Sequence, residues 1–336
     1  RQHANVKPAV LVTRRVPVSA LSRLKSACDV DLYVEQEGLS PEALRERISG
    51  KCGLVCMVTD TIDRSVIDAG TDLRVIANVA VGYDNVDVAY AQSRGIFVTN
   101  TPDVLTQAVA EFTWGLILAV SRRIAEGDRL VRAGRWTGWA LDFMLGMSLY
   151  GKRLGIVGPG RIGRAVAGRA QAFGMDVVVT GRKEPAKVME QTDPEFSGIR
   201  RVSLDELLVT SDVVSLHVPM NDATRHLIDR RALTRMKRTA FLINTSRGPI
   251  VDEAALVWAL QERLVAGVGL DVYEEEPSVH PGLYSLETAV LAPHLGSATG
   301  ETRTAMADLA AENVVSVVNG NPPITPVTPE LPGSSI

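Results

Sequence analysis

The chain has 336 residues, enough for two domains, and its 46% hydrophobic and 22% charged residues are ordinary for a globular protein. A net charge of −3 and only 5% aromatic residues argue against nucleic-acid or membrane binding by bulk attraction. No run of about 18 apolar residues predicts a membrane span, and the first residues, RQHANVKPAV, do not resemble a signal peptide. The three cysteines, Cys28, Cys52 and Cys56, favour buried thiols over disulfides or a metal site, so a cytoplasmic location is predicted.

The first hundred residues alternate between short β-rich runs and helical stretches. One helical stretch, SPEALRERIS, begins with a Ser-Pro pair that suits a helix N-terminus. This alternation predicts a parallel sheet with helices on both faces. The expected strands are residues 10–13, 30–34, 54–58, 75–79 and 96–100.

One long helix is predicted over residues 102–123, and its largely apolar second half predicts burial between domains or at a subunit contact. A second strand series follows, which predicts a doubly wound sheet of the dinucleotide-binding kind. A last helix over about residues 300–319 precedes a Pro-rich tail, NPPITPVTPELPG, that should be extended or loose. The strands expected in the second series are residues 153–158, 176–181, 212–218, 240–245, 267–272 and 289–294.

A glycine motif follows the first strand of this second series. Gly158, Gly160 and Gly163 form the pattern G-x-G-x-x-G, and Arg161 and Ile162 lie within it. The motif opens a helix expected over residues 161–173, which is the context that a pyrophosphate-binding turn requires. The helix N-terminus would offer N–H groups and a positive dipole end to the phosphates. A glycine-rich turn without a ligand is the alternative.

The end of the next strand predicts the cofactor. A site for NAD normally has Asp or Glu there to bind the ribose 2′-hydroxyl group. Here the strand ends in Thr180, Gly181, Arg182 and Lys183, so two cations stand where a 2′-phosphate would lie. The sequence therefore predicts NADP(H) in preference to NAD(H). The alternative is that both cations are solvated and Glu184 binds the ribose.

Reactive side chains follow three later strands. Arg247 comes after AFLINT, a glutamate run comes after GVGLDV, and His294 ends AVLAPH. Ligands in open α/β sheets bind beyond the carboxyl ends of the strands. An arginine, a glutamate and a histidine can therefore meet near one crevice.

The segments GPGRIG, LINTSRGPIVDEAAL, GLDVYEEEP, LAPHLGSAT and NVAVGYDNVDVAYAQSRGIFVTNTPDVLT resemble the D-isomer-specific 2-hydroxyacid dehydrogenase family. Within it they resemble the NADPH-dependent glyoxylate/hydroxypyruvate reductases. The resemblance implies that Arg247, Glu276 and His294 form the catalytic set. Arg247 would orient a 2-keto acid and polarise its carbonyl, and His294 would donate a proton. Glu276 would favour the protonated imidazole, with Glu274 and Glu275 as the other candidates.

The resemblance assigns further positions. The backbone N–H groups of Val81 and Gly82 would bind the substrate carboxylate, although a plain turn is the alternative. Trp139 would reach a neighbouring subunit, or would pack between domains. His217 would be structural or near the cofactor, whereas His3, His226 and His280 look like loop or surface residues. Residues implied to contact the cofactor are Thr106, Val218, Pro219, Thr224, Thr245, Asp271 and Gly296, of which Asp271 could instead cap a turn.

The expected architecture is a Rossmann cofactor domain, residues 101–292, inserted into a flavodoxin-like substrate domain made of residues 1–100 and 293–336. Both are doubly wound parallel sheets, and closure of the two domains would expel water. The resemblance implies a homodimer that reduces glyoxylate or hydroxypyruvate with NADPH and needs no metal. Two alternatives stay open: an NAD-linked dehydrogenase of another D-2-hydroxy acid such as phosphoglycerate, and a non-enzymatic dinucleotide-sensing relative similar to the C-terminal-binding corepressors.

Overall fold

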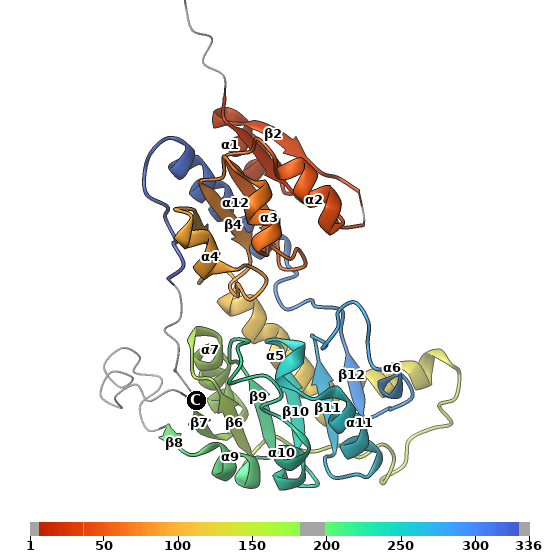
Figure 1. Ribbon diagram of the computed structural model, residues 1–336. Helices are drawn as coiled ribbons and strands as arrows, with labels where there is room; N and C mark the ends of the chain where they lie inside the picture. The colour runs from red at the N-terminus through yellow and green to blue at the C-terminus, as the bar shows by residue number, and fades with distance from the viewer. Residues whose placement is uncertain (1–6, 36, 182–198, 329–336) are drawn as a thin grey trace, which may run out of the picture. The chain divides into compact units, whose positions relative to one another are not determined.

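The computed structural model describes residues 7–35, 37–181 and 199–328, which fall into two compact units (Figure 1). The first unit combines the chain up to Leu105 with a return segment that begins at Ala298, and the second unit is Thr106–Ser297. The chain thus crosses after Leu105 and after Ser297, whereas the sequence predicted crossings after residues 100 and 292. Each unit is built on its own sheet, and every strand pair within the two sheets is parallel.

The sheet of the first unit has five strands in the order β2-β1-β3-β4-β5. This is the flavodoxin-like order, so the expected fold of this unit is confirmed. All five predicted strands are present; β4 has the predicted bounds, and the ends of the other four differ by one or two residues. Their bounds are β1 Ala9–Val12, β2 Asp29–Leu32, β3 Gly53–Met57, β4 Val75–Val79 and β5 Phe97–Thr99.

Helices cover both faces of this sheet because successive apolar residues of each strand point to opposite sides. On one face α1 (Val18–Ala27) and α12 (Gly300–Val318) pack on residues such as Val10 and Val55. On the other face α2 (Pro41–Ile48), α3 (Arg64–Ala69) and α4 (Val88–Ser93) pack on residues such as Leu11 and Leu54.

The described part of the Pro-rich segment, residues 321–328, is held against the sheet. Thr99 of the edge strand β5 forms an antiparallel bridge with Pro326, and the Val327 N–H donates to the Val98 carbonyl over 2.8 Å. The Gln92 side-chain amide donates to the Val327 carbonyl. The segment thereby pairs with backbone groups at a sheet edge that would otherwise be open.

The sheet of the second unit has seven strands in the order β12-β11-β10-β9-β6-β7-β8. The strand order reverses between β6 and β9, as in dinucleotide-binding sheets. The six predicted strands are present, and the seventh, β8, is a two-residue strand that the sequence pattern did not reveal. The bounds are β6 Arg153–Val157, β7 Asp176–Thr180, β8 Arg200–Arg201, β9 Val213–Leu216, β10 Phe241–Asn244, β11 Gly267–Leu270 and β12 Ala289–Leu291.

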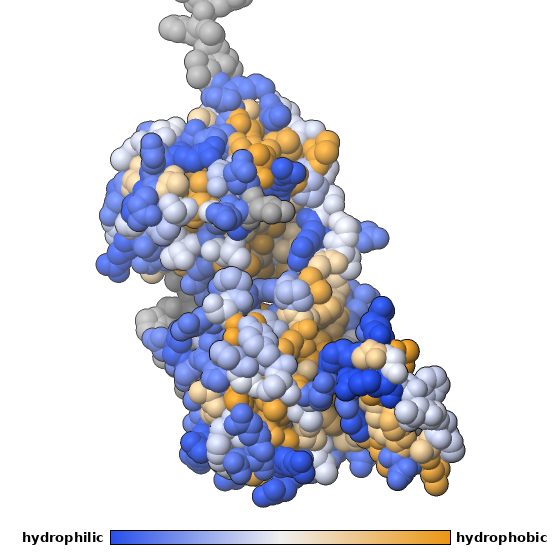
Figure 2. Space-filling model, turned by 90° about the vertical axis from the view of Figure 1, so that its right-hand side faces the viewer, coloured by the Kyte–Doolittle hydropathy of each residue, from blue (hydrophilic) through white to orange (hydrophobic). Residues whose placement is uncertain are grey.

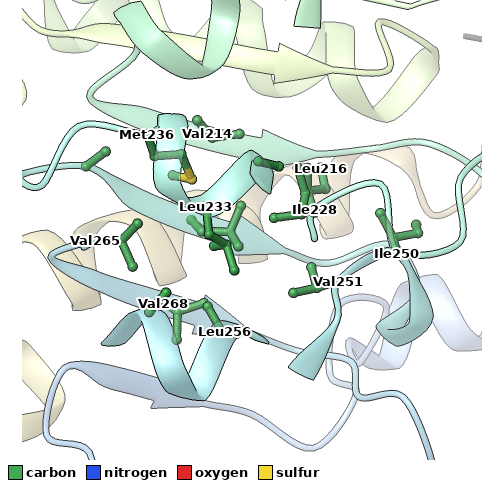
Figure 3. Packing of buried hydrophobic residues seen from close by; sticks show 14 of the residues in the cluster. Val214, Leu216, Ile228, Leu233, Met236, Ile250, Val251, Leu256, Val265 and Val268 are labelled. Atoms are coloured by element: carbon green, nitrogen blue, oxygen red, sulfur yellow. The ribbon is translucent and has the colours of Figure 1, made fainter. Parts of the chain in front are cut away.

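Each face of this second sheet also has its own core. On one face α9 (Leu204–Thr210), α10 (Arg230–Arg235) and α11 (Glu253–Gln261) cover the strands; Leu233 and Leu256 lie beside the strand residue Val268 (Figure 3). On the other face α5 (Thr106–Ser121) and α7 (Arg161–Ala170) pack on residues that include Ile156 and Ile243.

The single helix predicted over residues 102–123 is wrong in both its start and its end. The helix α5 begins only at Thr106, and Arg123, with a left-handed φ of 56°, separates it from α6 (Ile124–Arg132). The apolar side chains of α5 pack on α7 and on β10, β11 and β12, so its own unit accounts for its hydrophobic character. Among the described residues, no helix has both the length and the apolar composition that a membrane span requires.

Candidate active site

The glycine motif makes a close turn between β6 and α7. Gly158 has a φ of +94°, and a Cβ atom placed on it would lie 2.6 Å from the His217 carbonyl oxygen. A Cβ atom on Gly163 would lie 2.2 Å from the Gly158 carbonyl oxygen, whereas one on Gly160 would meet nothing within 4 Å. The first and third glycines therefore permit the packing, and the second leaves backbone open at the N-terminus of α7. These residues fit the pyrophosphate of a dinucleotide.

The neighbouring strand β9 ends beside this turn, at the point where the strand order reverses. His217 follows β9, its Nε2 lies 2.8 Å from Ser215 Oγ, and burial lowers the pKa of its imidazole to about 3. A half-buried, neutral histidine that is bonded to Ser215 supports the structural interpretation of His217. Val218 also contacts the turn, because a Cβ atom on Gly158 would lie 2.8 Å from Val218 Cγ1. Thr224 is buried and donates to the Pro219 carbonyl over 2.7 Å, so Pro219 and Thr224 form one compact turn.

The end of β7 lies against the same glycine turn. A Cβ atom on Gly181 would come within 2.6 Å of Pro159 Cδ. Arg182, Lys183 and Glu184, which carried the cofactor prediction, lie outside the described residues. A further cation does reach this point, because Arg201 of β8 donates from Nη1 to the Gly181 carbonyl over 2.8 Å. The guanidinium group of Arg201 therefore lies at the described end of β7.

Arg247 lies on a tight turn after β10. The buried Asn244 side chain donates to the Arg247 carbonyl over 2.9 Å and accepts hydrogen bonds from the Ser246 N–H and hydroxyl groups. A Cβ atom on the next residue, Gly248, would lie 1.8 Å from the carbonyl carbon and oxygen of Tyr273. The absent side chain at Gly248 therefore lets the Arg247 turn pack directly on the loop that carries Glu276.

Glu276 and His294 form a direct pair. Glu276 Oε2 lies 2.8 Å from His294 Nδ1, and Glu276 Oε1 accepts a hydrogen bond from the Tyr273 N–H. Partial burial favours a higher pKa of the Glu276 carboxyl, but the hydrogen bond and charge of His294, with the Tyr273 N–H and Arg247, outweigh it. The resulting pKa lies below the ordinary value, so Glu276 stays ionised beside the imidazole.

Asp271, at the end of β11, holds the turn that carries His294. Its carbonyl accepts the His294 N–H over 2.9 Å, and its carboxylate accepts the N–H groups of Leu295 and Gly296 over 2.6 and 2.8 Å. Burial raises the pKa of this carboxyl despite these donors. His294 has a φ of 56°, a conformation that is uncommon outside glycine. Three hydrogen bonds accepted by one aspartate therefore hold the turn in which the histidine has this backbone conformation.

Glu274 has a different role from Glu276. Its carboxylate pairs with His226 and accepts the Glu253 N–H over 3.1 Å, while Glu253 accepts the Glu274 N–H over 2.7 Å. These bonds attach the glutamate loop to the start of α11. His226, which the sequence suggested to be a loop or surface residue, lies in a turn and takes part in this attachment. Glu276 is the member of the run that contacts His294, whereas no hydrogen bond to His294 is described for Glu275.

The remaining predicted site residues lie in three places. Thr106 begins α5, and the Thr245 hydroxyl lies 2.9 Å from that of Thr113, so Thr245 is attached to the same helix. Val81 and Gly82 follow β4 at its carboxyl end, in the first unit. Trp139 lies in the segment after α6 with 81% of its surface exposed.

Large apolar side chains are exposed along residues 124–150, a segment that we call the arm. Leu141 is 82% exposed, and Leu145 and Val131 are 67% and 58% exposed. Figure 2 shows the face of the molecule that carries the arm, where hydrophobic side chains lie at the surface among hydrophilic ones. Exposed apolar surface of this kind is typical of a protein contact.

Sequence reasoning missed several polar residues that hold the site. Asn244 could have been found, because it ends a strand, like the residues that were singled out. Arg201 could not, since it reaches the tip of β7 only through the pairing of β8 with β7. The role of Glu274 also needs the fold, because its partners come from two distant segments.

Comparisons with known proteins agree with this arrangement. Residues 114–296 match the model of the D-isomer specific 2-hydroxyacid dehydrogenase family, NAD binding domain. The chain is 44% identical over 330 residues to a glyoxylate reductase of Thermococcus onnurineus, with 97% of each chain covered. It is similar to the crystal structure of an NADPH-dependent glyoxylate/hydroxypyruvate reductase from Sinorhizobium meliloti in complex with NADP and malonate, with a TM-score of 0.83, 33% identity, and 96% and 97% coverage. For a glyoxylate reductase from Paecilomyes thermophila the TM-score is 0.85 at 34% identity, with 96% and 98% covered.

Proposed function

Because the chain belongs to the D-isomer-specific 2-hydroxyacid dehydrogenase family, we propose that it reduces a small 2-keto acid to the D-2-hydroxy acid with NADPH. The substrates we propose are glyoxylate and hydroxypyruvate, which give glycolate and D-glycerate. The observation that carries the proposal is the 2.8 Å contact between Glu276 and His294 beside the Arg247 turn. This group lies in the same unit as the glycine turn that fits a dinucleotide.

The residues divide the chemistry among them. The bound cofactor supplies the hydride. Arg247 orients the keto acid and polarises its carbonyl, while the N–H groups of Val81 and Gly82 bind the carboxylate. Since Nδ1 of His294 faces Glu276, Nε2 is the atom that gives a proton to the developing alkoxide. The ionised Glu276 stabilises the protonated imidazole until that proton leaves.

We propose NADPH as the preferred cofactor. The strand β7 ends at Thr180 and is followed by Gly181, and neither residue can bind a ribose hydroxyl group as a carboxylate does. The Arg201 guanidinium at Gly181 adds positive charge at the place where a 2′-phosphate would lie. The similarity to a reductase solved with NADP supports the same preference.

The test is a set of absorbance assays of NADPH and NADH oxidation against glyoxylate, hydroxypyruvate, pyruvate and phosphohydroxypyruvate. We expect turnover of the two small keto acids with a higher kcat/KM for NADPH than for NADH. Preference for NADH with phosphohydroxypyruvate would favour the NAD-linked alternative. Dinucleotide binding without turnover of any keto acid would favour the non-enzymatic alternative.

We further propose that the protein is a cytoplasmic homodimer whose contact is formed by the arm. The arm carries exposed apolar side chains together with acidic and basic residues such as Asp128 and Arg132, a composition that can contact a second copy of itself. The family resemblance supports a dimer, and Trp139 is the aromatic residue best exposed for such a contact. The free thiols of Cys28, Cys52 and Cys56 support a reducing compartment.

A further inference from the structure

The loop after β4 has three successive carbonyl groups that accept hydrogen bonds from within the first unit. The Ala80 carbonyl accepts the Thr101 N–H over 2.8 Å, and the Val81 carbonyl accepts the Asn100 side-chain amide over 2.8 Å. The Gly82 carbonyl accepts the Asn78 side-chain amide over 2.9 Å. The orientation of each peptide group in this loop is therefore set by a named donor.

These bonds determine where the N–H groups of the loop point. In a trans peptide the N–H and the preceding C=O point in opposite directions. The Val81 and Gly82 N–H groups belong to the peptides whose carbonyls face Thr101 and Asn100, so both are directed away from that segment. Within the described part of the chain, neither N–H donates to another residue. Two adjacent donors directed in this way can bind a carboxylate.

Asn100 is itself held by the Pro-rich segment. The Thr325 hydroxyl donates to the Asn100 carbonyl over 2.7 Å and accepts the side-chain amide of Asn313 over 2.8 Å. Asn313 is fully buried in α12, and its Oδ1 accepts the Thr325 N–H over 2.9 Å. A continuous series of hydrogen bonds thus leads from α12 through Thr325 and Asn100 to the Val81–Gly82 peptide.

The other side of the loop is held separately. Asn78, also fully buried, exchanges hydrogen bonds with Asn85, whose amide donates to the Met57 and Asp60 carbonyls. This second network fixes the Gly82–Tyr83 peptide but does not contact the Val81 carbonyl. Control of the Val81–Gly82 peptide therefore falls to Asn100 alone among the described side chains.

We propose that Asn100 is a positioning residue for the substrate carboxylate, and that Thr325 and Asn313 set its position. The inference rests on the proposed function, in which Val81 and Gly82 bind that carboxylate. Without the Asn100 amide the Val81–Gly82 peptide can rotate, and the Gly82 donor is then lost for part of the time. The Pro-rich segment after α12 thereby contributes to substrate binding without contacting the substrate.

The test compares steady-state constants of Asn100→Ala, Thr325→Val and the wild type with glyoxylate. We expect Asn100→Ala to raise KM for glyoxylate roughly tenfold, the effect of one lost hydrogen bond to a charged group. Thr325→Val, which acts through Asn100, should raise KM by roughly threefold. The inhibition constant of oxalate should rise in parallel, whereas NADPH affinity, measured by fluorescence titration, should stay within about twofold.

Gln92→Ala is the matched control, since its amide donates to the carbonyl of Val327 in the same segment over 2.8 Å without touching the loop. Its KM should equal that of the wild type. The double variant Asn100→Ala/Thr325→Val should be no worse than Asn100→Ala, because both lie on one series of bonds. If Asn100→Ala unfolds, Thr325→Val and its oxalate constant still decide the question.

Two results would overturn the inference in different ways. An active wild type with an unchanged KM in Asn100→Ala and Thr325→Val would disprove the positioning role and leave the proposed function intact. A loss of NADPH affinity equal to the loss of glyoxylate affinity would show a general structural defect. A wild type that reduces no 2-keto acid would instead refute the proposed function.

Discussion

At the scale of single residues, the charge of Glu276 is the property that the proposed proton transfer needs. Glu276→Gln keeps the size of the side chain but removes the anion beside His294 Nδ1. We expect kcat for reduction to fall roughly 10- to 100-fold, because the protonated imidazole loses its anionic partner. The measurement is kcat against pH in the reductive direction. Glu275→Gln, an exposed neighbour, is the control and should keep the wild-type profile.

The low pKa of Glu276 has its own consequence for pH dependence. Because the carboxyl is more acidic in the folded protein than in the unfolded chain, its pairing stabilises the fold above its unfolded pKa. That contribution is lost as the pH falls through the lower, folded pKa. At neutral pH the Glu276 carboxylate is therefore fully ionised and available to the imidazole.

Arg201 is the described residue that we expect to contribute to a preference for NADPH over NADH. Arg201→Gln retains an amide donor for the Gly181 carbonyl but removes the positive charge. We expect binding of 2′,5′-ADP to weaken roughly tenfold while 5′-AMP binding stays within twofold, since only the former carries the 2′-phosphate. Calorimetric titration measures both. Arg200→Gln is the control, because it removes the same charge from the adjacent residue, whose guanidinium pairs with Glu206 over 2.7 Å. It should leave both affinities unchanged. Equal losses for the two nucleotides in Arg201→Gln would disprove the assignment.

The sequence could place the reactive side chains and single out Asp271, including its possible role in a turn, but it could not show which groups Asp271 and Asn244 bind. Arg247, Glu276 and His294 follow strand ends, and the structure brings Glu276 and His294 into contact. The hydrogen bonds of Asp271 and Asn244 depend on how neighbouring strands are aligned, which no local pattern encodes. The catalytic roles themselves remain predictions that the variants above test.

At the scale of elements, the packing of the Arg247 turn on the Tyr273 loop requires a glycine. In Gly248→Ala the new Cβ atom would overlap the Tyr273 carbonyl, which is backbone and cannot move aside. We expect a loss of roughly 2–3 kcal/mol in unfolding free energy and a large drop in kcat/KM, because the turn must shift. Denaturant unfolding and initial rates measure the two effects.

Gly115→Ala is the contrasting variant. Gly115 lies in the middle of α5, where an added Cβ atom meets nothing within 4 Å. Alanine there should stabilise the protein by about 0.5–1 kcal/mol through helix propensity. If the two alanine variants destabilise equally, close packing at Gly248 is not the reason for its glycine.

Most helices and strands were predictable from the sequence, because short β-rich runs alternate along the chain with stretches that have helical patterns. The exceptions have physical reasons. The strand β8 has two residues, too few for a periodic pattern, and Arg201 in it reads as an ordinary cation. The break between α5 and α6 depends on the left-handed backbone conformation of Arg123. An arginine in a sequence does not predict this conformation, because it is uncommon outside glycine. The helix start at Thr106 follows a turn in which Asp103 also has a positive φ of 69°.

At the scale of the whole molecule, the exposed apolar side chains of the arm predict that the protein is a dimer. A triple variant, Trp139→Ser/Leu141→Ser/Leu145→Ser, removes three exposed apolar side chains without touching a buried core. We expect the wild type to be a dimer and the variant a monomer by size-exclusion chromatography with light scattering, because apolar contact drives such association. Val18→Ser, a residue that is 80% exposed in the first unit, is the control and should remain dimeric.

The same variant separates assembly from cofactor binding. The glycine turn, Arg201 and the Glu276–His294 pair all belong to the second unit of one chain and make their described contacts within it. The monomeric variant should therefore bind NADPH with wild-type affinity, measured by fluorescence titration. A monomeric wild type would refute the arm as a subunit contact. A variant that loses NADPH affinity along with dimerisation would show instead that the dinucleotide site depends on the second copy.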